Sequence, residues 1–118
     1  MDFRQNVETI VRQDPRYKTE AYEFVSEAVG YTCELLECRR HITGQELLEG
    51  IRECALEKFG PLAKFMLNEW GVRCCGDFGY IVFNMVNMGL LGKTEQDRIE
   101  DFSDGYDFEE AFEKPFEG

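Results

Sequence analysis

The chain has 118 residues, a length that fits one domain with its own hydrophobic core. Its formal net charge is -11, and such a field repels DNA, RNA and anionic lipid. No segment approaches the roughly 18 apolar residues of a membrane span, and the amino-terminal residues lack the apolar core of a signal peptide. We therefore expect a cytoplasmic globular protein.

The first two predicted helices are separated by a proline. Asp2 is a candidate cap for a helix that runs to about Gln13 and ends at Asp14-Pro15, because the residue before proline avoids helical angles. Thr19 is a candidate cap for a longer second helix. Its buried stripe is predicted to contain Tyr22, Val25, Ala28, Val29, Thr32 and Leu36.

The third and fourth helices have clear boundary signals. Thr43 and Glu46 have the spacing of a capping box, which predicts a third helix that runs to Phe59. Gly60 is typical of a helix end, and Pro61 is a favourable first residue for a short fourth helix that ends near Trp70.

The last third of the chain is predicted to contain a fifth helix and a hairpin. Asp77 is the candidate cap of the helix, which runs to Met88. Residues 90–91 would open a β-hairpin with its tip at 94–98 and its return at 99–102. Alternatively, Thr94 caps a short helix.

Most of the negative charge is concentrated at the C-terminal end. Residues 95–118 carry 10 acidic and 2 basic side chains, against 14 and 11 in residues 1–94. We therefore predict a domain over residues 1–102 and an acidic, aromatic extension over residues 103–118. The four-residue spacing of Phe108, Phe112 and Phe116 favours an amphipathic final helix packed on the domain. The alternative is a segment that inserts into a partner.

Two resemblances follow from this pattern. The short helix, glycine turn, apolar helix and Gly-Leu-Leu strand entry over residues 61–102 resemble the winged helix-turn-helix of multiple-antibiotic-resistance repressors. The segments DPRYKTEAYEFV, HITGQELLEGIR, ALEKFGPLAKFML, WGV, DFGYIVFNMV, LLGKTEQDRIEDF and YDFEEAF resemble a small uncharacterised bacterial family associated with planctomycetes and verrucomicrobia. That family implies no catalytic or ligand residues. It is expected to carry a Thr–acid pair where this chain has Cys75-Gly76.

The predicted fold is therefore mainly α, with some β structure. It is a helical bundle with a winged-helix-like second half, a small β-hairpin and an acidic C-terminal extension. The fifth helix lacks positive charge, so protein contact is favoured over DNA readout. Its outer side chains form either an exposed apolar patch or a face buried against the first two helices. The candidate partner-binding residues are Tyr80, Phe83, Asn84, Asn87, Met88 and Phe112.

Cysteine and histidine patterns do not support a metal or catalytic site. The odd number of cysteines favours reduced thiols. Cys33, Cys38 and His41 lie close in sequence, but no second ligand pair with matching spacing accompanies them. No metal, cofactor or catalytic residue is predicted. The predicted function is a non-enzymatic protein-binding or adaptor module with a basic protein as the charge-matched partner; the alternatives are a winged-helix DNA regulator and a small thiol or metal sensor.

Overall fold

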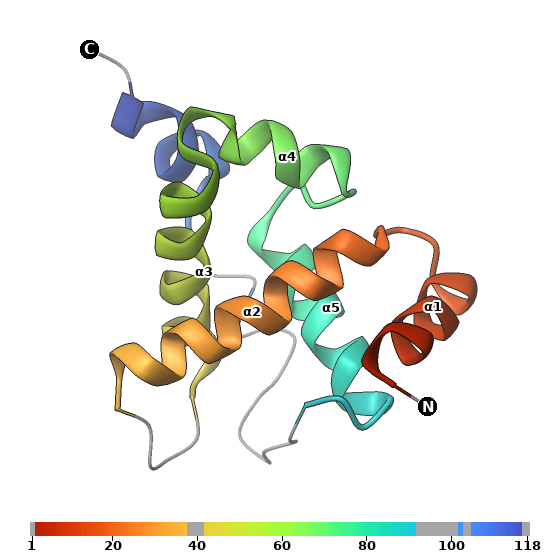
Figure 1. The fold of residues 1–118 in the computed structure, drawn as a ribbon. Helices are drawn as coiled ribbons and strands as arrows, with labels where there is room; N and C mark the ends of the chain where they lie inside the picture. The colour runs from red at the N-terminus through yellow and green to blue at the C-terminus, as the bar shows by residue number, and fades with distance from the viewer. Residues whose placement is uncertain (1, 38–41, 92–101, 103–104, 117–118) are drawn as a thin grey trace.

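The computed structural model describes residues 2–37, 42–91, 102 and 105–116, and these form a helical bundle (Figure 1). No strand occurs within those residues. None of the described helices is long and apolar enough to cross a membrane. The elements are α1 (Phe3–Gln13), α2 (Thr19–Leu35), α3 (Gly44–Phe59), the 3-10 helix η1 (Gly60–Leu62), α4 (Ala63–Glu69), α5 (Cys75–Asn87), the π-helix η2 (Glu109–Glu113) and the 3-10 helix η3 (Lys114–Phe116).

Local capping interactions set the starts of α1 and α3, as predicted. The Gln5 backbone N–H donates to the Asp2 carboxylate at 2.9 Å, and the Glu46 N–H donates to the Thr43 hydroxyl at 3.1 Å. Both capping boxes are complete, because the side chain at the third helical position accepts in return from the backbone of the cap residue. The predicted end of α3 at Phe59 is also confirmed, followed by Gly60 with φ of +54°.

Two predicted caps were displaced. The cap of α2 is Lys18, which makes no side-chain capping bond; its N–H donates to the Trp70 carbonyl at 3.1 Å. The cap of α5 is Cys74, three residues before the predicted Asp77. Asp77 lies at the third helical position, where its carboxylate accepts from the backbone N–H groups of Arg73 and Cys74. The sequence signal was therefore a capping carboxylate, assigned to the wrong end of the capping box.

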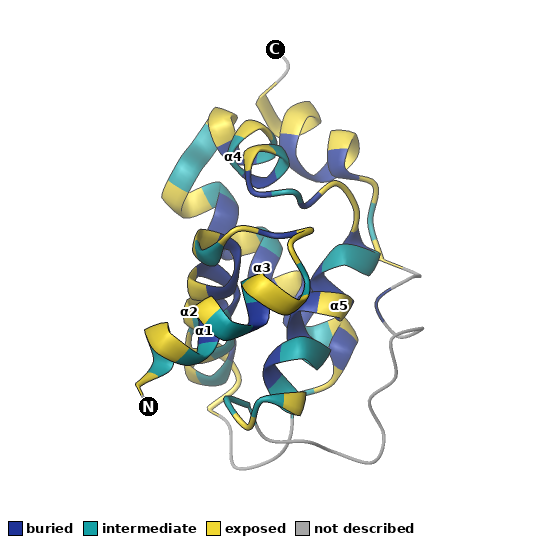
Figure 2. Cartoon of the chain, turned by 90° about the vertical axis from the view of Figure 1, so that its right-hand side faces the viewer, coloured by how far each residue is buried: buried dark blue, intermediate teal, exposed yellow. Residues whose placement is uncertain are grey.

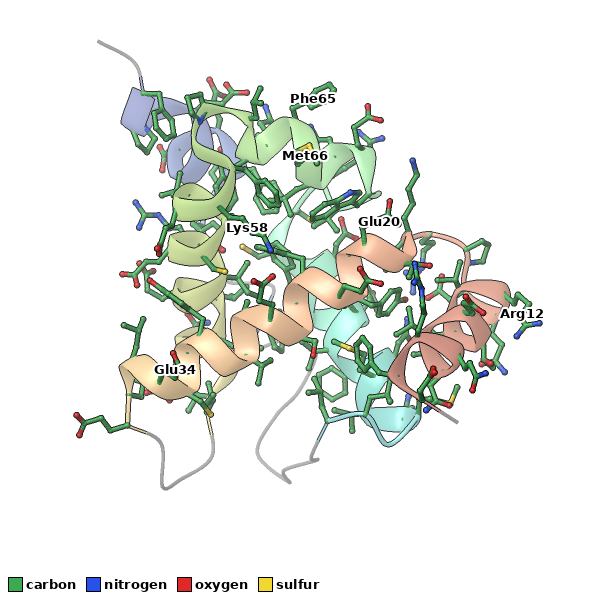
Figure 3. The ribbon with its side chains drawn as sticks, viewed as in Figure 1. Arg12, Glu20, Glu34, Lys58, Phe65 and Met66 are labelled. Atoms are coloured by element: carbon green, nitrogen blue, oxygen red, sulfur yellow. The ribbon has the colours of Figure 1, made fainter. Side chains whose placement is uncertain are left out.

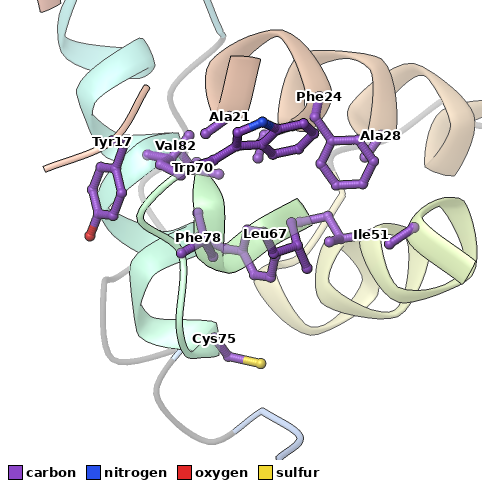
Figure 4. Packing of buried hydrophobic residues seen from close by; sticks show 14 of the residues in the cluster. Tyr17, Ala21, Phe24, Ala28, Ile51, Leu67, Trp70, Cys75, Phe78 and Val82 are labelled. Atoms are coloured by element: carbon purple, nitrogen blue, oxygen red, sulfur yellow. The ribbon is translucent and has the colours of Figure 1, made fainter. Parts of the chain in front are cut away.

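The core lies where α2 crosses α3 and α5 (Figures 1 and 4). Close approach of α2 and α3 depends on Gly50, since a Cβ there would lie 1.8 Å from the Thr32 hydroxyl oxygen. The largest fully buried side chains are Tyr17, Tyr22, Phe78, Phe102, Phe112, Leu48, Ile51, Leu67, Ile81, Met85, Val7 and Val25.

Helix α4 is held against this core by aromatic side chains. Trp70 packs on Phe24 and Phe59, with ring centroids 5.8 and 5.5 Å apart. Gly71 then ends the helix with φ of +93°, and a Cβ at this position would lie 2.1 Å from the Arg16 carbonyl oxygen. Only glycine satisfies both conditions, so the turn between α4 and α5 lies directly against the α1–α2 loop.

The predicted hairpin falls almost entirely on residues 92–101, which lie outside the described residues. The described residues at the two ends of the predicted hairpin are not in a strand; they are Leu90, Leu91 and Phe102. Phe102 is instead buried against Gly79 of α5, where a Cβ would lie 2.9 Å from the phenylalanine Cβ. The bundle is thus confirmed, and the winged-helix second half stays a prediction.

Residues 105–116 pack on the domain, as the favoured alternative predicted. The Tyr106 hydroxyl donates to the Leu48 carbonyl at 2.8 Å, and the rings of Phe108 and Phe112 lie 5.0 Å apart in the core. The predicted amphipathic final helix consists of a π-helix followed by a 3-10 helix. The described part of the proposed extension therefore contributes to the same core as the rest of the domain.

Candidate functional site

A polar network joins the end of α1 to the outer face of α5. Helix α1 ends before Pro15, so Asp14 lies just beyond its last residue. The Asp14 carboxylate accepts two hydrogen bonds from the Arg16 guanidinium, at 2.8 and 2.6 Å. Asn84 of α5 donates to the same carboxylate at 3.0 Å and to the Tyr22 hydroxyl at 3.1 Å. Asn84, predicted to meet a partner, is therefore used to join α5 to the α1–α2 corner.

A second set of contacts extends this network along α5. The Tyr17 hydroxyl donates to the Asp77 carboxylate at 2.6 Å. The Arg16 guanidinium carbon lies 4.5 Å from the ring centroid of Tyr80 and 5.2 Å from that of Tyr17. These distances allow cation–π attraction. Tyr80 is 39% exposed, with Arg16 over its ring.

The contacts of the network keep Asp14 and Arg16 ionised and the Tyr17 hydroxyl protonated. The hydrogen bonds from Arg16 place the pKa of Asp14 well below its ordinary value of 3.8, and Asp14 in turn raises the pKa of Arg16. Burial, together with the bond to Asp77, raises the pKa of the Tyr17 hydroxyl. A carboxylate that stays ionised and a phenol that stays protonated are poorly suited to general acid–base catalysis near pH 7.

An open hollow lies beside this network. It measures about 170 Å³ and opens between α1 and the end of α5. Three of the predicted partner-binding residues line it, on the α5 side. Its lining consists of Ile10, Gln13, Asp14, Asn84, Asn87 and Met88.

The predicted apolar patch on α5 is divided in the structure. Phe83 is half-buried and packs edge-on against Phe102, with ring centroids 6.4 Å apart. Met88 is also half-buried, and Phe112 is completely buried. Phe112 is therefore corrected from a surface residue to a core residue, because η2 folds onto the domain.

The thiols occupy different environments. Cys74 is exposed, whereas Cys75 is buried and donates to the Tyr106 carbonyl at 3.3 Å. Burial raises the pKa of Cys75 to about 11, which disfavours the reactive thiolate. Cys38 and His41 lie outside the described residues. Within the described ranges, no three His, Cys, Asp or Glu side chains are grouped as a metal site requires.

A different surface exposes large apolar side chains, at the end of the molecule formed by α4 and η3. Leu62 and Phe65 are each 60% exposed, and Phe116 is 46% exposed. We call these three residues the end surface. Sequence reasoning missed it, although the three-residue spacing of Leu62 and Phe65 places both on one side of a short helix.

Comparisons with protein-family models, with curated proteins and with solved structures find no match to this chain. The two family resemblances therefore stay predictions.

The polar network has a testable pH dependence. Because the pKa of Asp14 is lowered on folding, its contribution to stability is present above its ordinary value of 3.8 and is lost as pH falls through the folded-state value. We expect Asp14→Asn to lower the free energy of unfolding by about 1–3 kcal/mol at pH 7. The difference from wild type should shrink below about pH 4. Urea unfolding of both proteins at several pH values measures this.

The matched control is Glu8→Gln, at an exposed position of α1 without an ion pair among the described residues. This variant should follow the wild-type pH profile. A constant difference between Asp14→Asn and wild type down to pH 2.5 would contradict the assignment.

Proposed function

We propose that this protein is a non-enzymatic binding module that docks a partner protein on its end surface. The observation that carries the proposal is the 60% exposure of both Leu62 and Phe65 on the η1–α4 segment, whose opposite side is buried. Scattered single apolar residues need no explanation, but neighbouring large ones are typical of contact sites. Phenylalanine is also among the residue types enriched at protein interfaces.

The polar network around α5, unlike the end surface, has the features of a structural contact and not of a docking site. Its charged and phenolic groups are engaged with one another, and every buried side-chain nitrogen or oxygen of the described residues has a hydrogen-bond partner. Networks of this kind hold elements together. We therefore favour the end surface over the docking surface around α5 that the sequence predicts.

A DNA-associated regulator of winged-helix type is the alternative that the order of α4, turn and α5 supports. Charge weighs against it. Helix α5 carries Asp77 and no basic side chain. Arg16, beside it, is already neutralised by Asp14 at 2.6 Å. Phosphate binding depends on unpaired Lys or Arg side chains, so protein docking is favoured.

Phe65→Ser is expected to weaken partner capture strongly while leaving the fold intact. The side chain projects away from the body of the molecule at the outer side of α4 (Figure 3), so its loss removes contact area without creating a core cavity. Loss of an aromatic anchor weakens an interface by about tenfold or more. Quantitative affinity capture from native lysate, with circular dichroism of both proteins, measures the effect.

The matched control is Leu35→Ser, which removes a 54% exposed apolar side chain from a second exposed pair at the end of α2, since Leu36, predicted to be buried, is 40% exposed. It should capture the same proteins as wild type. Equal capture by all three proteins would contradict the proposal. Binding of random duplex DNA at tens of micromolar protein in low salt would instead support the DNA alternative.

A further inference from the structure

The apolar part of the end surface is narrow and rigidly supported. Leu62 and Phe65 lie on the outer side of the η1–α4 segment, whereas Ala63 and Leu67 on its inner side are completely buried. Figures 1 and 2 show η3, which carries Phe116, at the same end of the molecule as α4, and much of this end is exposed. Support from the core means that docking here loses little conformational entropy.

The border of this surface is acidic. The two nearby lysines are already paired, since the Lys64 amine lies 2.9 Å from the Glu113 carboxylate and the Lys114 amine lies 3.4 Å from that of Glu110. Residues 60–70 and 105–116 together carry five acidic and two basic side chains. The exposed carboxylates on these segments that make no ion pair among the described residues belong to Glu69, Asp107 and Glu109.

The negative charge of the protein favours some binding partners for the end surface over others. A second copy of this chain would bring another net charge of -11 and the same acidic border, so self-association is opposed electrostatically. An anionic membrane is opposed for the same reason. A segment with basic side chains beside apolar ones would match both the border and the centre.

The length of α4 limits the shape of that segment. Its seven residues extend over about 10 Å, or two turns of a helix, and Leu62 lies directly before it as the last residue of η1. A partner helix with apolar residues at i, i+3, i+4 and i+7 presents a stripe of similar length. We propose that the end surface binds a basic amphipathic helix of a partner protein, its apolar stripe on Leu62 and Phe65 and its Lys or Arg side chains toward Glu69 and Glu109. This inference rests on the proposed function.

The test uses three synthetic peptides of about 14 residues, or four helical turns. One carries leucines in a single stripe with lysines elsewhere, the second has glutamates in place of the lysines, and the third is a scrambled form of the lysine peptide. Fluorescence anisotropy with the full chain should show binding of the lysine stripe peptide that weakens as salt rises. Phe65→Ser should weaken it about tenfold, whereas Leu35→Ser should not.

Several results would overturn the inference. Equal binding of the scrambled peptide, equal binding of the glutamate peptide, or an affinity unchanged by Phe65→Ser would each do so. Sedimentation that shows self-association lost in Phe65→Ser would identify a second copy as the occupant. If lysate capture depends on Phe65 but the lysine stripe peptide does not bind, the proposed function stands and the basic-helix inference fails.

Discussion

Phe112→Ala is expected to lower the free energy of unfolding by about 3–5 kcal/mol, the cost of truncating a fully buried aromatic side chain. Phe112 is 0% exposed. Its ring centroid lies 5.0 Å from that of Phe108 and 5.7 Å from that of Tyr106. Small domains are stable by only about 5–15 kcal/mol, so the loss is a large share of the total. Urea denaturation followed by circular dichroism measures it.

The control is Phe116→Ala, which makes the same chemical change four residues later at a position 46% exposed. A surface substitution of this kind should change the free energy of unfolding by no more than about 0.5 kcal/mol. Equal, small effects of the two substitutions would mean that residues 105–116 are not docked in solution. The division into a domain and a separate acidic extension would then hold.

Gly50→Ala is expected to destabilise the protein by about 1–3 kcal/mol, although alanine normally favours a helix over glycine. The added Cβ would lie 1.8 Å from the Thr32 hydroxyl oxygen and 2.9 Å from the Thr32 Cβ. Thr32 is β-branched, 2% exposed and bonded to the Ala28 carbonyl at 2.8 Å, so it has little freedom to move. Helices α2 and α3 must therefore separate. Thermal and urea unfolding measure the change.

Two further variants test this cause. Gly30→Ala introduces the same methyl group in α2, at an exposed position with nothing within 4 Å, and should stabilise the protein by about 0.5–1 kcal/mol. Thr32→Ala in the Gly50→Ala background should recover part of the loss, since the 1.8 Å contact disappears while the 2.9 Å contact remains. Strictly additive effects of the two substitutions would argue against a direct clash between these side chains.

Helix boundaries could be predicted from the sequence where the interactions that set them are local. The capping boxes at Asp2 and Thr43 and the helix end at Asp14-Pro15 involve residues no more than three positions apart, so the sequence alone was sufficient. Misassignment of the α5 cap to Asp77 has the same local origin. A carboxylate at the third helical position and one at the cap both serve the first turn, and the residue pattern did not distinguish them.

Which side chains are exposed was less predictable, because exposure depends on contacts between segments that are distant in the sequence. The position of Asn84 on the outer side of α5 was readable from periodicity, but its bond to Asp14, 70 residues away, was not. Burial of Phe112 likewise depends on the return of the C-terminal segment to the domain. Helix α4 has only seven residues, too few for periodicity to assign its outer side.

The sequence by itself determined that the chain is acidic and mainly helical and where most of its helices begin and end, because charge, caps and breakers act through neighbouring residues. The tertiary structure decided which apolar side chains stay at the surface. Phe112 is fully buried, Phe83 is half-buried, and Arg16 lies over the ring of Tyr80. Leu62 and Phe65 remain exposed. The physical reason is that burial is a property of packed pairs of elements, whose approach is set by contacts such as that of Gly50 with Thr32.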